Sequence, residues 1–221
     1  MAATTFLDDF DAVLFDMDGT LVETEALWFE AGRGVAVRYG AAVPPEAAER
    51  LHGLDVPTLV ELLTSDYGLK ATLGEYSDAV HADVLARLAH ADSRPGAREL
   101  VEGAAASGKL TALVSNSSHA VIEATLAPYD WARLLERRFS VDEVAEGKPA
   151  PDLYLHAAAE LGVDPRRCLV VEDSVAGVTA AVRAGATCVA VSFELKPAAF
   201  GDLTELVVPS LHEAADLILG R

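Results

Sequence analysis

The chain has 221 residues, of which 51% are hydrophobic, so it can bury a large core and is not expected to be disordered. Its formal net charge is −18, from 17 basic and 35 acidic side chains. Nucleic acid and anionic membrane surfaces are therefore excluded as expected partners, because both need clustered Lys and Arg. Two cysteines are too few for a disulfide framework, and the first residues lack the pattern of a signal peptide. We expect a cytoplasmic protein.

A short apolar strand is predicted over residues 12–15, and two carboxylates follow it, Asp16 and Asp18, with Gly19 next. Side chains alternate along an extended chain, so both carboxylates would point the same way. A parallel strand that ends in acidic residues delivers them to the carboxyl edge of its sheet, where open α/β folds bind their ligands. An ordinary Asp-Gly turn has the same composition, so this stretch alone leaves that alternative open.

Residues 23–91 show helical periodicity and no convincing strand. The spacing of apolar side chains predicts a helix over 25–39 and a shorter one that Pro44 opens and Gly53 ends. Asp55 is the expected N-cap of a third helix. A fourth is predicted over 73–91. Four helices inserted after the first strand form a lobe of their own, which can act as a lid over a ligand site.

From Ser93 onward, helices and apolar strands alternate, as in a parallel sheet built from crossover connections. Strands are expected at 110–114, 139–141, 168–171, 187–191 and 206–208, and helices at 97–107, 119–126, 151–161, 175–184 and 211–219. The predicted fold class is α/β, with a Rossmann-like parallel sheet flanked by helices and an inserted all-helical cap domain. We expect a core domain over 1–20 and 93–221 and the cap over 21–92.

Polar side chains close two later strands and open one helix. Ser115 and Asn116 end one strand, Glu172 and Asp173 end another, and Lys148 precedes a helix. Parallel strands share their carboxyl edge, so up to four carboxylates would meet a hydroxyl, an amide and an ammonium group. Crowded carboxylates suit a hard cation such as Mg²⁺, and a loop lysine can hold a phosphate. Taken singly, the strand-end residues could equally be helix caps, and a lysine in such a loop would more often be a surface lysine.

Together, these segments resemble the four motifs of the haloacid dehalogenase superfamily of phosphohydrolases. Residues 16–20 are similar to the first motif, 115–116 to the second, 148–149 to the third and 172–177 to the fourth. The helical insert resembles the small α-helical cap of the β-phosphoglucomutase-like branch. Residues 23–28 look most like the sugar-phosphate phosphatases of that branch.

The resemblance implies a hydrolase that transfers a phosphoryl group through an aspartyl-phosphate, with Mg²⁺ as cofactor. Asp16 would attack phosphorus, and Asp18 would protonate the leaving alcohol and later activate water. The implied catalytic residues are Asp16, Asp18, Ser115 and Lys148. The implied metal ligands are Asp16, Asp18 (through its backbone carbonyl), Glu172 and Asp173. The implied substrate-binding residues are Gly19, Thr24, Glu25, Trp28, His52 and Asn116.

Two positions in the cap separate a phosphatase from a mutase. In the mutases of this branch, a histidine aligns with Trp28 and an arginine that grips a second phosphate aligns with Val56; both are missing here. We therefore expect a phosphatase acting on a small phosphorylated metabolite, sugar phosphates foremost, working as a monomer or weak homodimer. A phosphomutase is the alternative, and a non-catalytic phosphate-binding module is a more distant one. Asp18 argues against a dehalogenase, which does not need this second aspartate.

Overall fold

The computed structural model describes residues 6–44, 47–51, 54–193, 195 and 197–221. The chain divides into two compact units, which we describe one by one. The first, called the core unit here, joins Met1–Glu23 to Asp92–Arg221, and the second, the helical unit, is Thr24–Ala91. The helical unit thus interrupts the core unit directly after the segment that follows the first strand.

The core unit is built on a six-stranded sheet with the order β5-β4-β1-β6-β7-β8, in which each neighbouring pair is parallel. Its strands are β1 (Ala12–Phe15), β4 (Leu110–Ser115), β5 (Arg137–Ser140), β6 (Cys168–Glu172), β7 (Thr187–Val191) and β8 (Val207–Val208). β1 lies at the centre, between β4 and β6. The chain order reverses on either side of β1, which is the point at which open α/β sheets bind ligands.

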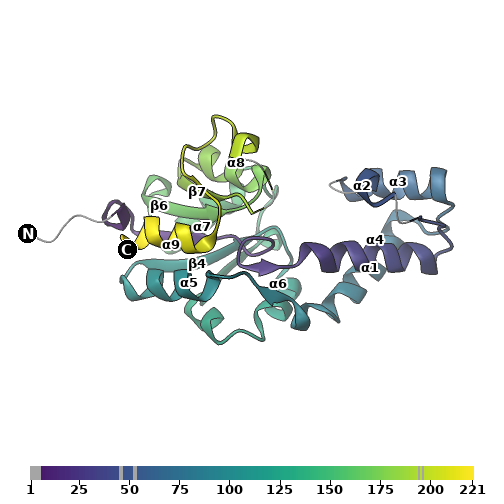
Figure 1. Ribbon diagram of the computed structural model, residues 1–221, viewed down its shortest axis with the longest axis horizontal. Helices are drawn as coiled ribbons and strands as arrows, with labels where there is room; N and C mark the ends of the chain where they lie inside the picture. The colour runs from purple at the N-terminus through teal and green to yellow at the C-terminus, as the bar shows by residue number, and fades with distance from the viewer. Residues whose placement is uncertain (1–5, 45–46, 52–53, 194, 196) are drawn as a thin grey trace, which may run out of the picture. The chain divides into compact units, whose positions relative to one another are not determined.

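Helices cover both faces of this sheet (Figure 1). They are α5 (Ala97–Ala106), α6 (His119–Leu126), α7 (Asp152–Leu161), α8 (Val175–Ala184) and α9 (Leu211–Leu219). α5 packs against α9, and α7 packs against α8. This confirms the predicted α/β fold with a Rossmann-like parallel sheet flanked by helices.

The strands are apolar throughout because both of their faces are covered. Ala12 and Leu14 of β1 belong to a buried hydrophobic cluster that includes Leu153 of α7 and Val178 of α8. The alternate residues of β1, Val13 and Phe15, are also fully buried. Since neighbouring side chains point to opposite faces, they lie on the face that α5 and α9 cover.

A two-stranded antiparallel pair, which the sequence did not predict, stands where the chain leaves the core unit and returns to it. β2 (Val22–Glu23) pairs with β3 (Asp92–Ser93). Strands of two residues are too short for alternation to be visible in a sequence. Their pairing holds the two ends of the insertion together within the core unit.

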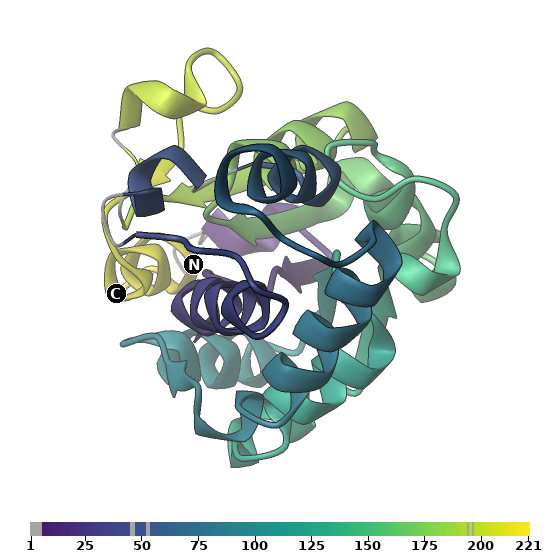
Figure 2. The ribbon, with the colours of Figure 1, turned by 90° about the vertical axis from the view of Figure 1, so that its right-hand side faces the viewer.

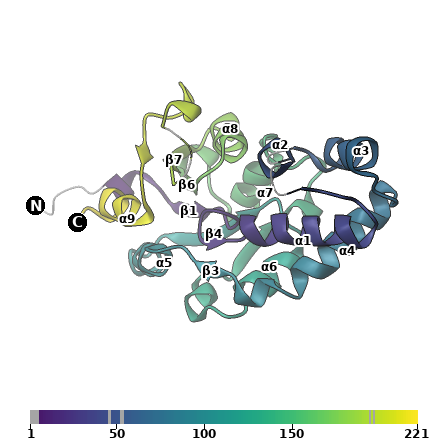
Figure 3. The same ribbon diagram turned by 45° about the vertical axis from the view of Figure 1, so that its right-hand side comes forward.

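The helical unit contains α1 (Glu25–Arg38), α2 (Ala48–Leu51), α3 (Val56–Tyr67) and α4 (Leu73–Leu85). α1 and α4 lie side by side (Figure 3), and Figure 2 looks nearly along α1, the dark purple helix. As predicted, Asp55 caps α3 by accepting a hydrogen bond of 3.0 Å from the Thr58 amide. Among the described residues, no helix is both long and apolar enough to span a bilayer.

One helix of this unit is shorter than predicted. α4 ends at Leu85, and a separate 3-10 turn, Leu88–His90, follows it. There the amides of Arg87 and His90 bond to carbonyls three residues back, a tighter pattern than that of an α-helix. The described part of α2 is Ala48–Leu51. Pro45, His52 and Gly53 lie outside the described residues, so the predicted bounds of this helix and the predicted role of His52 stay predictions.

Candidate active site

The predicted strand ends meet at one edge of the core unit. In register, Phe15 of β1 lies beside Leu113 of β4 and Val171 of β6, so the next residues along the three strands, Asp16, Val114 and Glu172, lie side by side. The Nζ atom of Lys148 joins these strands. It donates to Asp16 Oδ1 at 2.7 Å, to Glu172 Oε1 at 2.6 Å and to the Val114 carbonyl at 2.8 Å.

Lys148 is a buried lysine, and the surface alternative does not apply to it. Its side chain is 4% exposed, and its ammonium group donates to three acceptors. Burial alone would lower the pKa of Lys148, but the charges of Asp16 and Glu172 outweigh that effect and raise this pKa above its ordinary value. Lys148 therefore keeps its positive charge against the carboxylates.

Three carboxylates crowd the same edge. Asp16, Glu172 and Asp173 each offer one oxygen, and these oxygens lie within 4.8 Å of one another. Burial, with the charge of Glu172 added, raises the pKa of Asp16 well above its usual value. The same two causes raise the pKa of Asp173 to about 7. One lysine does not balance this negative charge, and a hard divalent cation fits such a set of oxygen donors.

Glu172 and Asp173 differ in what surrounds them. Glu172 is fully buried, and its Oε1 accepts from Lys148 and from the Tyr154 hydroxyl at 2.9 Å. Its Oε2 accepts from the Ser174 hydroxyl at 3.1 Å and from the amides of Asp173 and Ser174. Asp173 is only partly buried and accepts a bond of 2.9 Å from Thr20. Glu172 is thus committed to protein donors, whereas Asp173 is open to a ligand.

The helix-cap alternative for these two acids is settled by the next residue. The side chain of Ser174, not that of Glu172 or Asp173, accepts from the Gly177 amide at 2.9 Å and caps α8. A Cβ atom on Gly177 would lie 1.8 Å from Glu172 Oε1, so a glycine is needed for the helix to pass this carboxylate. The start of α8 is built around Glu172.

Asp18 is held by two hydroxyl groups. Ser115 Oγ donates to Asp18 Oδ2 at 3.0 Å, and Ser117 Oγ donates to the same oxygen at 2.8 Å. Asp18 is not one of the three carboxylates of the cluster around Lys148. The structure therefore separates the two aspartates of the first motif: Asp16 contacts an ammonium group and Asp18 contacts hydroxyl groups.

Asn116 contacts the backbone of Lys148 at both ends of its amide. Its Nδ2 donates to the Lys148 carbonyl at 3.0 Å, and its Oδ1 accepts from the Lys148 amide at 2.8 Å. A Cβ atom on Gly147 would lie 2.7 Å from Asn116 Oδ1, so the loop approaches the amide closely. Asn116 fixes the position of the lysine loop, and its predicted contact with substrate stays a prediction.

Gly19 makes room for Asp173. Its φ is +83°, and a Cβ atom there would lie 2.4 Å from Asp173 Oδ2. The Gly19 carbonyl accepts from Arg94 Nε at 2.9 Å, and Arg94 also pairs with Glu23. Arg94, the residue that follows β3, thus holds the turn after β1 in place.

Sequence reasoning missed three residues that hold this site: Tyr154, Ser117 and Arg94. Ser117 had a weak signal, because it is a hydroxyl residue two positions after Ser115, just past the end of β4. In the sequence, Tyr154 looks like one more apolar position of α7. The carboxylate to which its hydroxyl group donates, that of Glu172, lies 18 residues away. Arg94 lies 75 residues from Gly19, and no local pattern connects them.

A family model for haloacid dehalogenase-like hydrolases matches residues 10–185, which include all of the residues around Lys148 described above. The chain belongs to the haloacid dehalogenase-like hydrolase family. The resemblance drawn from the four motifs is confirmed, and the protein is a hydrolase of this family.

Known relatives extend this comparison. The chain is 34% identical to the bifunctional riboflavin kinase/FMN phosphatase of Arabidopsis thaliana over 180 residues, which are 81% of this chain but 48% of that protein. It is 33% identical to the phosphorylated carbohydrates phosphatase of Thermotoga maritima over 178 residues, which are 79% of this chain and 82% of that protein. The structure of CbbY from Rhodobacter sphaeroides in complex with phosphate shares 28% identity, with a TM-score of 0.79 over 92% of this chain and 96% of that one. The chain spans about half of the Arabidopsis protein and most of the other two.

The remaining predicted substrate residues belong to the helical unit. Thr24 is buried directly before α1, and Glu25 is the first residue of that helix. Trp28 is partly buried, and its ring meets the ring of His81 edge to face, with 5.2 Å between their centres. Packing and ligand contact both remain open to Trp28, so its role in this hydrolase stays a prediction.

Proposed function

We propose that the chain is a phosphatase that releases phosphate from a small phosphorylated metabolite, with sugar phosphates as the first class to test. The observation that carries the proposal is the buried Asp16–Lys148–Glu172 group, with Asp18 close to Asp16 in the chain but in a different set of contacts. The relatives support the reaction class, since the names of two of them describe phosphatases and one of these acts on phosphorylated carbohydrates.

Asp16 is the proposed nucleophile. A carboxylate oxygen of Asp16 forms a bond to phosphorus as the bond from phosphorus to the alcohol oxygen breaks, which leaves an aspartyl-phosphate. A carboxylate that approaches a phosphate faces repulsion between like charges. The ammonium group of Lys148, 2.7 Å from Asp16 Oδ1, offsets that repulsion and holds the carboxylate in place.

Asp18 is the proposed general acid and base. It protonates the leaving alcohol oxygen in the first step and takes a proton from the attacking water in the second. The hydroxyl groups of Ser115 and Ser117, at 3.0 and 2.8 Å, aim its carboxyl group. Ser115 can turn its hydroxyl from Asp18 to a phosphate oxygen when substrate binds.

We propose that Mg²⁺ is the cofactor and that Asp16 and Asp173 hold it, with the backbone carbonyl of Asp18. Bound there, the ion would supply positive charge that lowers the cost of bringing a phosphate to these carboxylates. Glu172 lies beside this position. Ser174 holds its Oε2, and its Oε1 accepts from Lys148, so we assign Glu172 the role of holding the lysine in place. This assignment ranks Asp173 above Glu172 as a ligand.

The predicted setting of the enzyme is part of the same proposal. A cytoplasmic monomer or weak homodimer, with no nucleic acid or membrane partner, agrees with the net charge of −18. Thr24, Glu25, Trp28 and His52 are proposed to contribute to substrate choice. The core domain over 1–20 and 93–221 would carry out the chemistry, and the cap over 21–92 would select the substrate.

The test is phosphate release from a panel of phosphorylated sugars, sugar alcohols, nucleotides and small acids, with and without Mg²⁺. Wild type is compared with Asp16→Asn and with Asp202→Asn, which makes the same change at an exposed position of the core unit. We expect Mg²⁺-dependent release that Asp16→Asn abolishes and Asp202→Asn retains. If a folded wild-type protein releases no phosphate from any substrate, the phosphatase proposal fails, and a mutase that needs a bisphosphate primer becomes the better hypothesis.

A further inference from the structure

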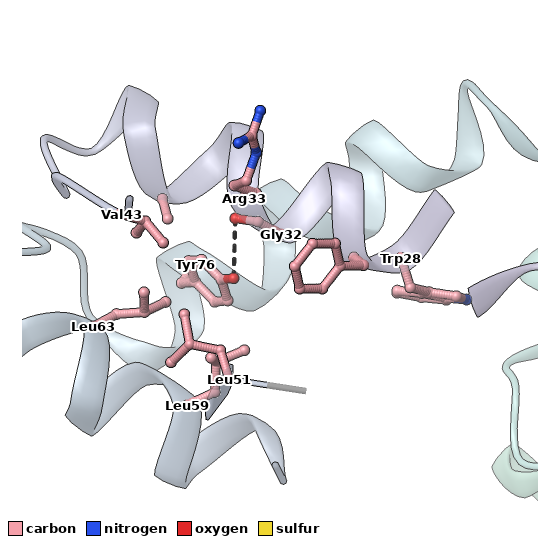
Figure 4. Close-up of a pocket in the computed structure, with 10 residues that line it drawn as sticks. Trp28, Gly32, Arg33, Val43, Leu51, Leu59, Leu63 and Tyr76 are labelled. Atoms are coloured by element: carbon pink, nitrogen blue, oxygen red, sulfur yellow. Dashed lines mark hydrogen bonds between the residues drawn. The ribbon is translucent and has the colours of Figure 1, made fainter. Parts of the chain in front are cut away.

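The helical unit contains two adjoining cavities, of about 250 and about 70 Å³. Both are bordered by residues of α1, α2, α3 and α4, and six residues line both of them: Trp28, Phe29, Gly32, Leu51, Leu59 and Tyr76. Figure 4 shows the smaller one, with Tyr76 between α1 and the leucine side chains. We call the two together the helical pocket. It lies wholly within one unit.

Aromatic rings form much of the wall of the helical pocket. The Tyr76 hydroxyl donates to the Gly32 carbonyl at 3.1 Å, so its polar end is satisfied by the protein and its ring is left to face apolar neighbours (Figure 4). Trp28 and His81 meet edge to face on the larger cavity. The rings are thus fixed by contacts made before any ligand arrives.

Large apolar side chains at this pocket remain in contact with solvent. Phe29 is 36% exposed and Val56 is 45% exposed, and both line the larger cavity. Exposed apolar groups gathered around a concave site are typical of ligand-binding surfaces. Burying them against a ligand would be favourable.

The charges at the pocket argue against an anionic ligand. Among the described residues, no lysine or arginine lines the larger cavity, whose ionisable neighbours are Glu25, Tyr76 and His81. Arg33 borders the smaller cavity, but its guanidinium group points away from Tyr76 and Leu59 (Figure 4). A second phosphate group would meet a carboxylate and apolar walls there.

We propose that the helical pocket binds an uncharged planar ring, either as a free small molecule or as the ring of a phosphorylated alcohol. The second source rests on the proposed phosphatase function. Size agrees with this ligand class, since a dry apolar cavity of about 150 Å³ is enough for benzene. The larger cavity, at about 250 Å³, accommodates one substituted ring.

The binding test uses benzyl alcohol as the neutral ring and Trp28 as the reporter. The sequence has two tryptophans, and the other, Trp131, is 2% exposed and stacks on Tyr129 in the core unit. In Trp131→Phe, emission therefore comes from Trp28 alone. We expect saturable quenching with a dissociation constant on the order of 1 mM, as befits a ligand of this size. Calorimetry on the wild type gives the same constant without relying on the fold of the variant.

Two matched substitutions show where the ring binds. Val56→Lys places an ammonium group on the larger cavity, and Val37→Lys makes the same change at a 56% exposed position of α1 that does not line it. We expect Val56→Lys to weaken binding of benzyl alcohol about fivefold, the loss of part of one buried apolar side chain. Val37→Lys should leave binding unchanged. No saturable signal with the wild type, or equal effects of the two substitutions, would overturn the proposal.

Turnover separates the two sources of the ring. If the substrate carries the ring, benzyl alcohol inhibits hydrolysis of benzyl phosphate competitively, and Val56→Lys lowers kcat/KM for benzyl phosphate relative to glycerol 3-phosphate about fivefold. If the ring is a separate ligand, benzyl alcohol binds while that ratio stays constant; either result supports the pocket. Phosphate release without binding of benzyl alcohol would refute the proposed ring-binding pocket and support the proposed phosphatase function. Binding of benzyl alcohol without phosphate release from any substrate would support the pocket and refute the phosphatase function.

Discussion

The edge of the core sheet is lined by charged groups that pair with one another, whereas the helical pocket is lined mainly by apolar and aromatic side chains. At the edge, Lys148 is buried, and its ammonium group donates to Asp16, to Glu172 and to the Val114 carbonyl. In the helical pocket, apolar side chains such as Phe29 and Val56 are partly exposed, and the bond from Tyr76 to Gly32 ties one polar end to the protein. The sheet edge therefore offers charged groups already held by protein partners, whereas the helical pocket offers apolar surface that a ligand could still bury.

The largest expected effect breaks the charged group at the sheet edge. Lys148→Gln leaves Asp16 and Glu172 buried without their ammonium partner. We expect turnover to fall at least about 10³-fold and the free energy of unfolding to drop by about 3 kcal/mol. Phosphate release and urea unfolding measure the two losses. Lys70→Gln, at an exposed position of the helical unit, is the control; a stable and active Lys148→Gln enzyme would refute the assigned role.

Gly19→Ala tests the close approach to Asp173 separately from backbone strain. Gly19 and Gly108 have φ values of +83° and +79°, but an added Cβ meets Asp173 Oδ2 at 2.4 Å only at Gly19 and open space at Gly108. Both alanine variants should lose about 1 kcal/mol of stability from the left-handed backbone. We expect Gly19→Ala alone to lose turnover, by about 10²-fold. Equal activity in the two variants would show that contact with Asp173 is unimportant.

A smaller effect compares one hydroxyl group in each unit. Tyr154→Phe removes a bond to the carboxylate of Glu172, and Tyr76→Phe removes a bond to the carbonyl of Gly32. A bond to a charged group is worth more, so we expect losses of about 2 and about 1 kcal/mol in unfolding free energy. Only Tyr154→Phe should lower kcat, about tenfold, with little change in KM, because it acts through Glu172 on Lys148. A matching fall in kcat for Tyr76→Phe would mean that the first effect is only structural.

These two regions also differ in how far a sequence can predict them. The sheet edge could be predicted because β1, β4 and β6 end in or are followed by polar residues and parallel strands share an edge. In the structure Lys148 joins Asp16 to Glu172, and Ser115 bonds to Asp18. The contacts of Asn116 with the Lys148 backbone could not be predicted. A side-chain amide that follows a strand can bind a ligand, a loop or a helix end, and the sequence looks the same in each case.

The helices of the helical unit could be predicted from the sequence, but the pocket that they form together could not. Asp55 could be named as a cap because a side-chain oxygen three residues before an unpaired amide is a local signal. The pocket depends on which faces of α1, α3 and α4 meet, and periodicity gives the apolar face of a helix without its partner. The aromatic pair of Trp28 and His81 spans two helices, and no local pattern indicates it.

The two cysteines give a probe of unfolding in the core unit alone. Cys168 and Cys188 are both buried in the core unit, and the sequence has no other cysteine. Burial raises the pKa of Cys168 to about 11 and that of Cys188 well above its usual value, so the thiolate that reacts with iodoacetamide is scarce. At pH 8 we expect alkylation of Cys168 in the folded protein to be about 100-fold slower than in the unfolded chain, and alkylation of Cys188 to be slowed as well.

Alkylation across a urea series would then follow opening of the core unit, while the emission of Trp28 in Trp131→Phe would follow the helical unit. The charged contacts of the core unit are buried and the apolar wall of the helical pocket is partly exposed, so we expect the Trp28 signal to change at lower urea than the alkylation rate. Benzyl alcohol should narrow that gap, because a ligand stabilises the unit that binds it. Coincident transitions in the absence of ligand would show that the two units unfold as one, despite the difference in how they are built.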